Sequence, residues 1–360
     1  MKKLSILLSI LFIFICMLQT RCSREQWEGR IYEEQGVEVI ESHGSGLWGE
    51  IIEDKIDFIT ELTIGEEVGE DHLLFHSSLD VAVDSNQNIY VLDKRNYRFM
   101  SFDSKGNHIW TSGRQGQGPG ELQSPNKIKI TPSERICILD GFRRIHFYDL
   151  QGSYIRSISA SHSILDFQYT EDGRIFINTP LEQQAGLSAI IYDEKFELLE
   201  VFPIEYPYGP KISGWGMIGG DIRYIQDKIY MVLPDTYETR EYDVDGTFIR
   251  KIRRDFKFTP PEVKRIGSDG FSVSSRTRLG PIYLLMSKYL VVQIFQIVGE
   301  NEQDIVFSHS LDFFNIDGKF LCSYKLPDST RLLFIDSKNR FYFVSTDPFP
   351  KLIRSSVIID

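Results

Sequence analysis

The chain has few cysteines: four occur among 360 residues, and none lies in a C-x-x-C pair. Cys16 lies inside an N-terminal apolar run and Cys22 follows that run closely, whereas Cys137 and Cys322 each stand in a short apolar, strand-like segment. This set gives no disulfide framework. We therefore predict that Cys137 and Cys322 are buried free thiols that act as small hydrophobic side chains.

The chain also lacks an excess of basic residues. It carries 40 Lys and Arg against 51 Asp and Glu, a formal net charge of −11. Proteins that bind duplex nucleic acid need a basic footprint for the phosphates, so that class is excluded. Neither a phosphate loop with its Gly-Lys-Ser/Thr end nor a nucleophile elbow occurs, and no Ser-His-Asp or Cys-His arrangement can be argued.

The N-terminus fits a targeting segment. Lys2 and Lys3 precede an apolar run over residues 4–18, as a basic region precedes the apolar region of a secretory signal. This run is short for a membrane-spanning helix, which needs about 20 residues. No alanine occurs before Ala82, so the A-x-A site of ordinary signal peptidase is missing.

Cys22 ends the segment LQTRC, which is similar to a degenerate bacterial lipoprotein box. Leu18 lies four residues before Cys22 rather than three, and Arg21 takes a place normally held by a small residue. We predict a signal peptide over residues 1–21 and lipidation at Cys22, with simple secretion or a retained anchor as the alternatives. Loss of this segment removes three basic residues, so an anionic mature chain would need a covalent lipid to hold a membrane.

A five-residue phrase recurs along the chain: an aromatic residue, Asp or Asn, two variable residues and Gly. Asp or Asn opens a hairpin turn through its side chain, and Gly accepts the positive φ that the turn demands. Copies stand at 102–106, 148–152, 242–246 and 314–318, with a weaker copy at 192–196 that has Phe in place of Gly.

A β-rich run precedes each of these turns, and a sixth run stands near the C-terminus. The runs begin at residues 88, 135, 174, 228, 288 and 340, which gives intervals of 47, 39, 54, 60 and 52 residues. Such spacing is typical of propeller blades, each a small antiparallel sheet. The sequence therefore predicts an all-β, six-bladed β-propeller of four-stranded antiparallel blades.

The last blade is short of its outer strand, because the chain ends at residues 356–360, where the sixth turn would begin. Residues 55–64 alternate apolar and polar side chains ahead of the first blade. We predict that this N-terminal strand completes the last blade and closes the ring, which covers otherwise open sheet edges. The propeller is then one domain over 51–360, preceded over 22–50 by a tether and an irregular lead-in.

Residues 79–122 resemble an NHL-type propeller repeat. The phrases that carry this likeness are Asp84, residues 88–91, Asp93, Asn96, Arg98, residues 102–103 and Gly106. Together with the lipoprotein-like signal, they resemble the bacterial six-bladed β-propeller lipoproteins of the NHL-repeat-like group. The resemblance covers roughly residues 50–360 and is clearest over 79–159. It implies a fold and no particular reaction.

The resemblance also implies two kinds of metal site. Amidating-lyase propellers hold zinc with histidines from several blades, and lactonase-like propellers hold a divalent cation, which calcium would suit, with carboxylates in the central pore. The weak candidates here are Asp93, Asp140 and His146. The histidines do not occupy equivalent repeat positions, and the acidic series breaks at Thr179. We predict no cofactor, and that both aspartates stabilise the following turns.

A set of polar residues follows the second strand of the first two blades: Arg95, Asn96 and Arg98, then Arg143 and Arg144. Arginines at one place in adjacent blades could line a rim of the ring and grip an anionic ligand with their planar donors. The competing interpretation is ion pairing between blades.

Two loops offer further candidates. Residues 113–120 form a Gly-rich turn between blades, and Arg114 either pairs with Glu121 across it or faces a ligand. Trp215 lies in an aromatic and Gly-rich loop between the third and fourth blades, where it is either a recognition residue or a packing plug.

The sequence thus favours a monomeric propeller of the cell envelope that acts as a binding or scaffold module. Its predicted location is the outer membrane, attached through a lipid anchor and facing the periplasm or the cell surface. Its predicted partners are an envelope protein, a peptide or a glycan. The alternative is a metal-dependent hydrolase or lyase with its site at the axial pore.

Overall fold

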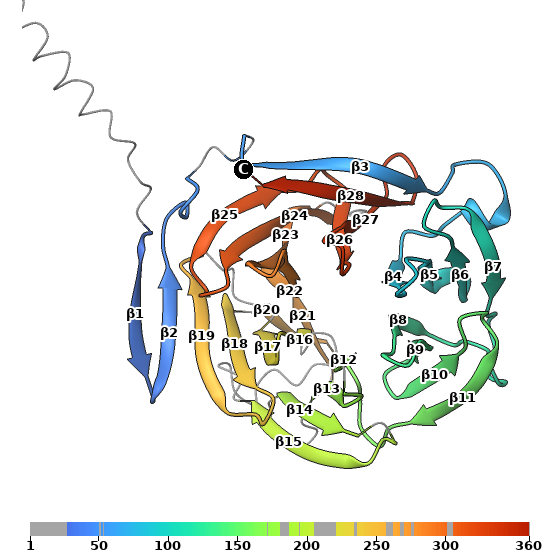
Figure 1. The fold of residues 1–360 in the computed structure, drawn as a ribbon, viewed down its shortest axis with the longest axis horizontal. Coiled ribbons are helices and arrows are strands. Elements are labelled where there is room, and N and C mark those ends of the chain that lie inside the picture. The colour runs from blue at the N-terminus through green and yellow to red at the C-terminus, as the bar shows by residue number, and fades with distance from the viewer. Residues whose placement is uncertain are drawn as a thin grey trace, which may run out of the picture.

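The computed structural model describes residues 27–49, 52, 54–170, 172–180, 187–193, 195–204, 221–233, 236–256, 262–266, 270–274, 277–300 and 305–359. Six sheets stand around a central axis as the blades of a propeller (Figure 1). The helical elements among these residues are two single 3-10 turns, η1 (Asp71–Leu73) and η2 (Lys94–Asn96). The predicted all-β, six-bladed propeller is confirmed.

The first three blades are four-stranded antiparallel sheets in simple chain order. The first blade holds β4 (Leu79–Val83), β5 (Ile89–Asp93), β6 (Arg98–Phe102) and β7 (His108–Ser112). The second holds β8 (Pro125–Ile130), β9 (Ile136–Asp140), β10 (Arg144–Tyr148) and β11 (Tyr154–Ser159). The third holds β12 (Asp166–Tyr169), β13 (Ile175–Pro180), β14 (Leu187–Tyr192) and β15 (Leu198–Ile204).

The last three blades recruit N-terminal strands or longer hairpins. The fourth holds β16 (Asp221–Ile225), β17 (Lys228–Leu233), β18 (Glu238–Asp243) and β19 (Phe248–Arg254). The fifth holds β22 (Thr277–Leu285), β23 (Tyr289–Glu300), β24 (Ile305–Asn315) and β25 (Phe320–Lys325). The sixth holds β26 (Thr330–Ile335), β27 (Phe341–Ser345), β28 (Lys351–Ile359) and β3 (Ile56–Ile64).

The recurrent sequence phrases fall where the propeller repeats. The β-rich runs are the second strands, such as β5 and β27, in which every residue is buried. Each aromatic-Asp turn joins a third strand to a fourth. In the first of these turns the Asp103 carboxylate accepts hydrogen bonds from the backbone N–H groups of Lys105 and Asn107, and Gly106 has φ +87°.

The ring closes through the predicted N-terminal strand. β3 pairs antiparallel with β28, in register from Ile56 opposite Ile359 to Ile64 opposite Leu352 (Figure 1). Ile56 and Ile64 are each only 3% exposed, because the sixth blade and its neighbours cover them. This pairing confirms that N- and C-terminal segments share one blade.

Residues 29–42 correct the predicted irregular lead-in. They form a hairpin of β1 (Gly29–Glu34) and β2 (Val37–Ser42), turned at Gln35 and Gly36, which both have positive φ. β2 pairs in parallel with β19, so the hairpin extends the fourth blade to six strands. Val39 and Ile40 are both buried although they follow one another in β2, so both faces of this strand are covered at that point.

The segment between the hairpin and β3 crosses the fifth blade. The backbone N–H groups of Leu47 and Trp48 donate to the carbonyl oxygens of Phe320 and Leu321 in β25. The Trp48 ring meets the Tyr289 ring edge-on at 5.6 Å between centroids. The described residues between 29 and 64 therefore form an N-terminal belt, in contact with the fourth, fifth and sixth blades in turn.

The core lies between the faces of adjacent blades. Cys137 and Cys322 are both buried free thiols, as predicted. Burial raises the pKa of each thiol to about 12, so they remain protonated and inert at neutral pH.

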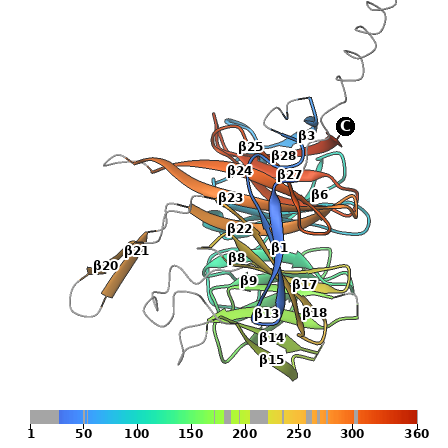
Figure 2. The same cartoon turned by 90° about the vertical axis from the view of Figure 1, so that its left-hand side faces the viewer.

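A further two-stranded hairpin, β20 (Glu262–Ile266) and β21 (Gly270–Ser274), extends from the ring between the fourth and fifth blades (Figure 2). Within the described part of the chain no helix has the length and apolar character to cross a membrane.

Candidate functional site

The axis of the ring contains a cavity of about 1100 Å³. The innermost strands of all six blades line it, namely β4, β8, β12, β16, β22 and β26. The loops that join the first to the second strand of each blade border one end, which we call the loop end. Several lining residues there are exposed, so the cavity opens to solvent at the loop end: Ser85, Pro132, Ser287 and Ser337.

Charged side chains gather along this cavity. Its cationic lining residues are Lys94, Lys127, Lys129, Arg223 and Arg331. Its acidic lining residues are Asp80, Asp84, Glu134 and Asp336. Two of these acids are engaged in the loops: Asp84 accepts hydrogen bonds from Asn88 and Tyr90, and Asp336 pairs with Arg340.

Three of the cations lie near Asp80 and make no ion pair with the described residues: Lys94, Lys127 and Arg331. Asp80 Oδ2 accepts instead from the backbone N–H of Ile128 at 2.9 Å. Arg331 donates to the carbonyl oxygen of Leu79 at 3.0 Å. We call these three residues the unpaired cation group.

Burial acts on the amines of this group. It lowers the pKa of Lys94 to about 8, although the nearby Asp80 charge opposes the shift. Burial also disfavours the charged form of Lys127, but the charges of Asp166, Asp80 and Asp221 outweigh it and raise the pKa. Lys127 therefore stays positive at neutral pH without a direct carboxylate partner.

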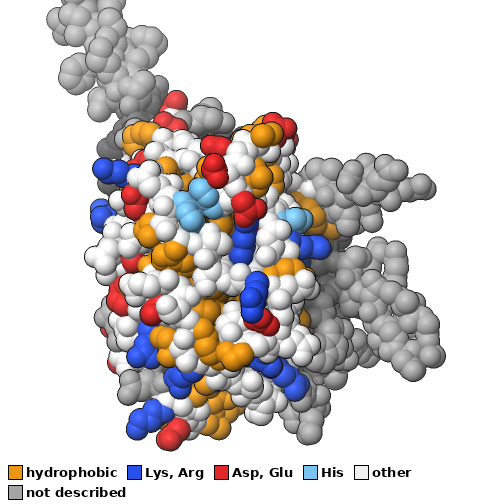
Figure 3. Space-filling model, turned by 90° about the vertical axis from the view of Figure 1, so that its right-hand side faces the viewer, with side chains coloured by type: hydrophobic (Ala, Val, Ile, Leu, Met, Phe, Trp, Pro, Cys, Tyr) orange, Lys and Arg blue, Asp and Glu red, His pale blue; other side chains and the backbone are white. Residues whose placement is uncertain are grey.

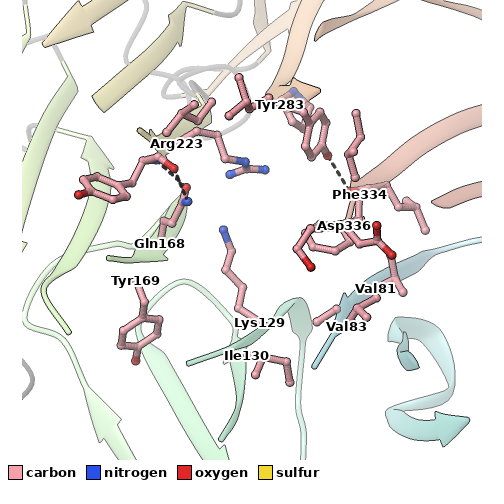
Figure 4. Close-up of a pocket in the computed structure, with 18 of the residues that line it drawn as sticks. Val81, Val83, Lys129, Ile130, Gln168, Tyr169, Arg223, Tyr283, Phe334 and Asp336 are labelled. Carbon is pink, nitrogen blue, oxygen red and sulfur yellow. Dashed lines mark hydrogen bonds between the residues drawn. The ribbon is translucent and has the colours of Figure 1, made fainter. Parts of the chain in front are cut away.

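The other two cations are neutralised by buried carboxylates. Lys129 Nζ lies 3.1 Å from Asp166 Oδ1, and Arg223 Nη1 lies 2.6 Å from Asp166 Oδ2 and 2.9 Å from Asp221 Oδ1. Figure 4 shows the Lys129 amine and the Arg223 guanidinium directed toward the centre of the cavity. One guanidinium nitrogen thus bridges two acids of adjacent blades.

The pKa values of the two bridged acids, Asp166 and Asp221, are shifted in opposite directions. Burial alone would raise the pKa of Asp166, but the charges of Lys129, Lys127 and Arg223 hold it well below its usual value. Burial raises the pKa of Asp221 well above its usual value, and the Asp166 charge raises it further despite Arg223. The ionised Asp166 therefore supplies most of the negative charge beside Lys129.

The residues singled out in the first blade lie away from this cavity. Arg98 is buried and pairs with Asp93 at 3.3 Å and with Asp71, while Asn96 Nδ2 donates to Asp93 Oδ2 at 2.7 Å. Arg95 is exposed on η2. Arg98 is thus held in ion pairs rather than directed at the cavity, and Asp93 fixes the turn between β5 and β6.

The equivalent residues of the second blade are also outside the cavity. Asp140 accepts from the backbone N–H groups of Gln123 and Ser124, and His146 Nε2 lies 3.3 Å from Asp140 Oδ2. Burial opposes the ionisation of Asp140, but these hydrogen bonds outweigh it and lower the pKa. Arg143 is exposed, and Arg144 is half-buried at the start of β10.

Arg114 Nη2 lies 2.7 Å from Glu121 Oε1, so the pair bridges the Gly-rich turn. Trp215 and Cys22 lie outside the described residues. Among the residues that are described, no three His, Cys, Asp or Glu side chains gather as metal ligands. On the outer face of the first two blades, acidic and basic side chains are interspersed (Figure 3).

The residues that line the axis escaped the sequence analysis, although a signal for them exists. Each innermost strand carries half-buried residues at its cavity-facing positions, such as Lys127 and Lys129 in β8 or Arg223 in β16. These charges lie a few residues ahead of each β-rich run. Aligning the segment before each run, rather than the turn after it, would have revealed them.

Comparisons with known proteins agree on the fold. The six-bladed propeller is the class that the sheets and the axial cavity define. A family model, DUF5128, described as a 6-bladed beta-propeller, matches residues 70–214. No curated protein matches the sequence.

Three of the solved structures that are similar to this chain illustrate the likeness. A member of the DUF4221 family from Bacteroides vulgatus matches at 12% identity and TM-score 0.62, over 85% of this chain and 99% of its own. A protein from Bacteroides fragilis, assigned as exported, matches at 10% identity and TM-score 0.60, over 89% and 99%. A luciferin-regenerating enzyme matches at 10% identity and TM-score 0.50, over 79% and 92%. At such identities the likeness shows the fold alone.

Proposed function

We propose that this protein is an exported binding module that holds a small anionic ligand in its axial cavity. The observation that carries the proposal is the unpaired cation group, Lys94, Lys127 and Arg331. These three side chains are half-buried and have acids nearby, but none makes a direct ion pair with a described carboxylate, so each has lost part of its hydration without a close partner. An anion that enters the cavity supplies that partner. Its attraction to the three cations offsets the unfavourable free energy of their lost hydration, and this gain favours binding.

The charge of the whole chain makes this cluster unusual. Net charge is −11, yet the cavity holds five cationic residues drawn from four blades. Low-dielectric walls focus the field of such a cluster and favour anions at its centre. Lys129 and Arg223 are paired with Asp166 and Asp221, so the positive charge that remains for a ligand lies at the unpaired cation group, and a ligand bound there is an anion rather than a divalent metal ion.

The proposal places the protein in the cell envelope. It rests on Lys2, Lys3, the apolar run and Cys22, and on the export assigned to the Bacteroides fragilis neighbour. In this proposal Cys22 carries a lipid that holds an NHL-like propeller to the outer membrane. A Cys22→Ala variant should move from the membrane fraction to the soluble fraction on cell breakage. Unchanged membrane partitioning of that variant would rule out the lipid anchor.

The test of the anion site is calorimetric titration of the full chain with sulfate, which stays dianionic from pH 7 to 9. Lys127→Met keeps the length of the side chain but removes its charge, and it should weaken sulfate binding about tenfold or more. The matched control is Lys105→Met, at an exposed position on an outer turn, which should leave the affinity unchanged.

The same titration has a pH dependence with a defined sign. Lys94 has a pKa of about 8, so it is charged below that pH and loses its charge as the pH rises through it. Sulfate affinity should therefore fall between pH 7 and pH 9. Equal affinities for the wild type and Lys127→Met would contradict the proposal, as would an affinity that rises with pH.

A further inference from the structure

The cavity has an apolar collar near its loop end. Each blade contributes one half-buried apolar or aromatic lining residue from its innermost strand. These residues, the collar, are Val83, Ile130, Tyr169, Tyr224, Leu284 and Phe334. Figure 4 shows Val83, Ile130 and Phe334 at the border of the space that Lys129 and Arg223 point into, whereas the Tyr169 ring is directed outward, with its hydroxyl 3.6 Å from Cys137 Sγ. A collar built from six separate strands is a feature of the ring rather than of one blade.

The collar and the unpaired cation group occupy different levels of the axis. Lys127 stands three residues before Ile130 in β8, and Arg331 stands three residues before Phe334 in β26. A strand rises about 3.3 Å per residue, so the two levels are roughly 10 Å apart. Lys94 follows the end of β5, which lies opposite the start of β4 and therefore away from the loop end.

The size of the cavity exceeds what an inorganic anion needs. About 1100 Å³ lies just above the range for sites that enclose a small organic ligand, about 300 to 1000 Å³. Sulfate at the cation group would leave the collar in contact with water alone. A ligand with an apolar part would bury the collar as well, and each methylene so buried raises affinity about fourfold.

We infer that the ligand is an amphiphilic anion that enters head first, with its anionic group at Lys94, Lys127 and Arg331 and its apolar chain or ring within the collar. This inference rests on the proposed anion site and adds the chemistry of the rest of the ligand. The loop end supports entry in this direction. Met286, 36% exposed at that end, is an adaptable side chain of the kind that accommodates varied apolar groups.

The test is a chain-length series on the full wild-type protein, measured by calorimetry with butanoate, hexanoate and octanoate. Affinity should rise about fourfold per methylene, and 1-octanol should bind far more weakly than octanoate because it lacks the charge. Adding 3-phenylpropanoate distinguishes an aromatic tail from a linear one. The series needs no variant, so it does not depend on the folding of any mutant.

Two variants distinguish the contribution of the anionic head to the affinity from that of the apolar tail. Phe334→Ser should weaken octanoate about tenfold while sulfate affinity stays unchanged, and Lys127→Met should weaken both ligands. Ile109→Ser is the matched control, because Ile109 is 51% exposed on β7, outside the cavity.

The outcomes also separate the two proposals. A flat chain-length series with intact sulfate binding overturns the amphiphile and leaves the anion site standing. Binding of 1-octanol as tight as that of octanoate overturns the head-first orientation. Absence of both sulfate and octanoate binding overturns the anion site and the inference together.

Discussion

Deleting residues 1–64, and with them β3, should leave a chain that no longer folds cooperatively at 25 °C. The deletion removes two core side chains, Ile56 and Ile64, and the half-buried Phe58, whose ring packs edge-on against Phe341 and Phe343. Burying such side chains stabilises a protein by about 1.5–3 kcal/mol each. Their combined loss is comparable to the whole stability of a typical domain, about 5–15 kcal/mol.

The deletion also opens the ring. β28 would keep β27 on one edge and expose its other edge, where eight residues now pair with β3. Such an edge invites association with other chains. Urea unfolding followed by circular dichroism should show that the single cooperative transition of the full chain is absent from the 65–360 protein. A deletion of residues 1–26, which leaves the belt intact, is the control and should unfold as the full chain does. A cooperative transition in the 65–360 protein would refute the role assigned to β3.

Replacing Asp312 by alanine should lower the free energy of unfolding by about 3–5 kcal/mol. Asp312 is fully buried in β24 of the fifth blade and pairs with Arg254, at the end of β19 in the fourth. Tyr237 donates a hydrogen bond to the same carboxylate oxygen. The Arg254 guanidinium also lies 3.9 Å from the centroid of the Phe320 ring. Removal of the acid leaves the largely buried Arg254 guanidinium, 13% exposed, without its counter-charge between two blades.

Urea unfolding at pH 7 measures this loss. Asp317→Ala is the matched control, because that side chain is exposed on the following turn and its removal should change stability by less than about 0.5 kcal/mol. An Asp312→Ala protein within about 1 kcal/mol of the wild type would show that the contact between the fourth and fifth blades does not depend on this pair.

The repeated turns and second strands made the architecture predictable. The residues of a phrase such as FDSKG determine the turn by themselves, because Asp103 caps the turn and Gly106 adopts the positive φ. Short apolar runs with β-branched residues, such as residues 136–139, favour buried strands over helices because of their length and residue types. The closing strand could be inferred because the sixth repeat lacks an outer strand of its own. Each of these signals lies within one repeat or in the count of repeats.

Contacts between distant segments were not predictable in the same way. Nothing in residues 37–42 indicates that they pair in parallel with β19, more than 200 residues later. The turn at Gln35 and Gly36 signals a hairpin, but not its partner. The axial cations were missed for a related reason. Lys127, Asp166 and Arg223 become neighbours only when three blades converge, and each alone resembles a surface residue of a strand.

The N-terminal belt determines how the propeller responds to force. A pull on the N-terminus first strips β1 from β2, then shears β2 from β19, then lifts Leu47 and Trp48 from the fifth blade. Only after these contacts have broken does tension reach β3 and its pairing with β28. The belt is therefore a series of sacrificial attachments. A chain held by its N-terminus would lengthen and dissipate load while the ring, with the cavity at its axis, stays closed.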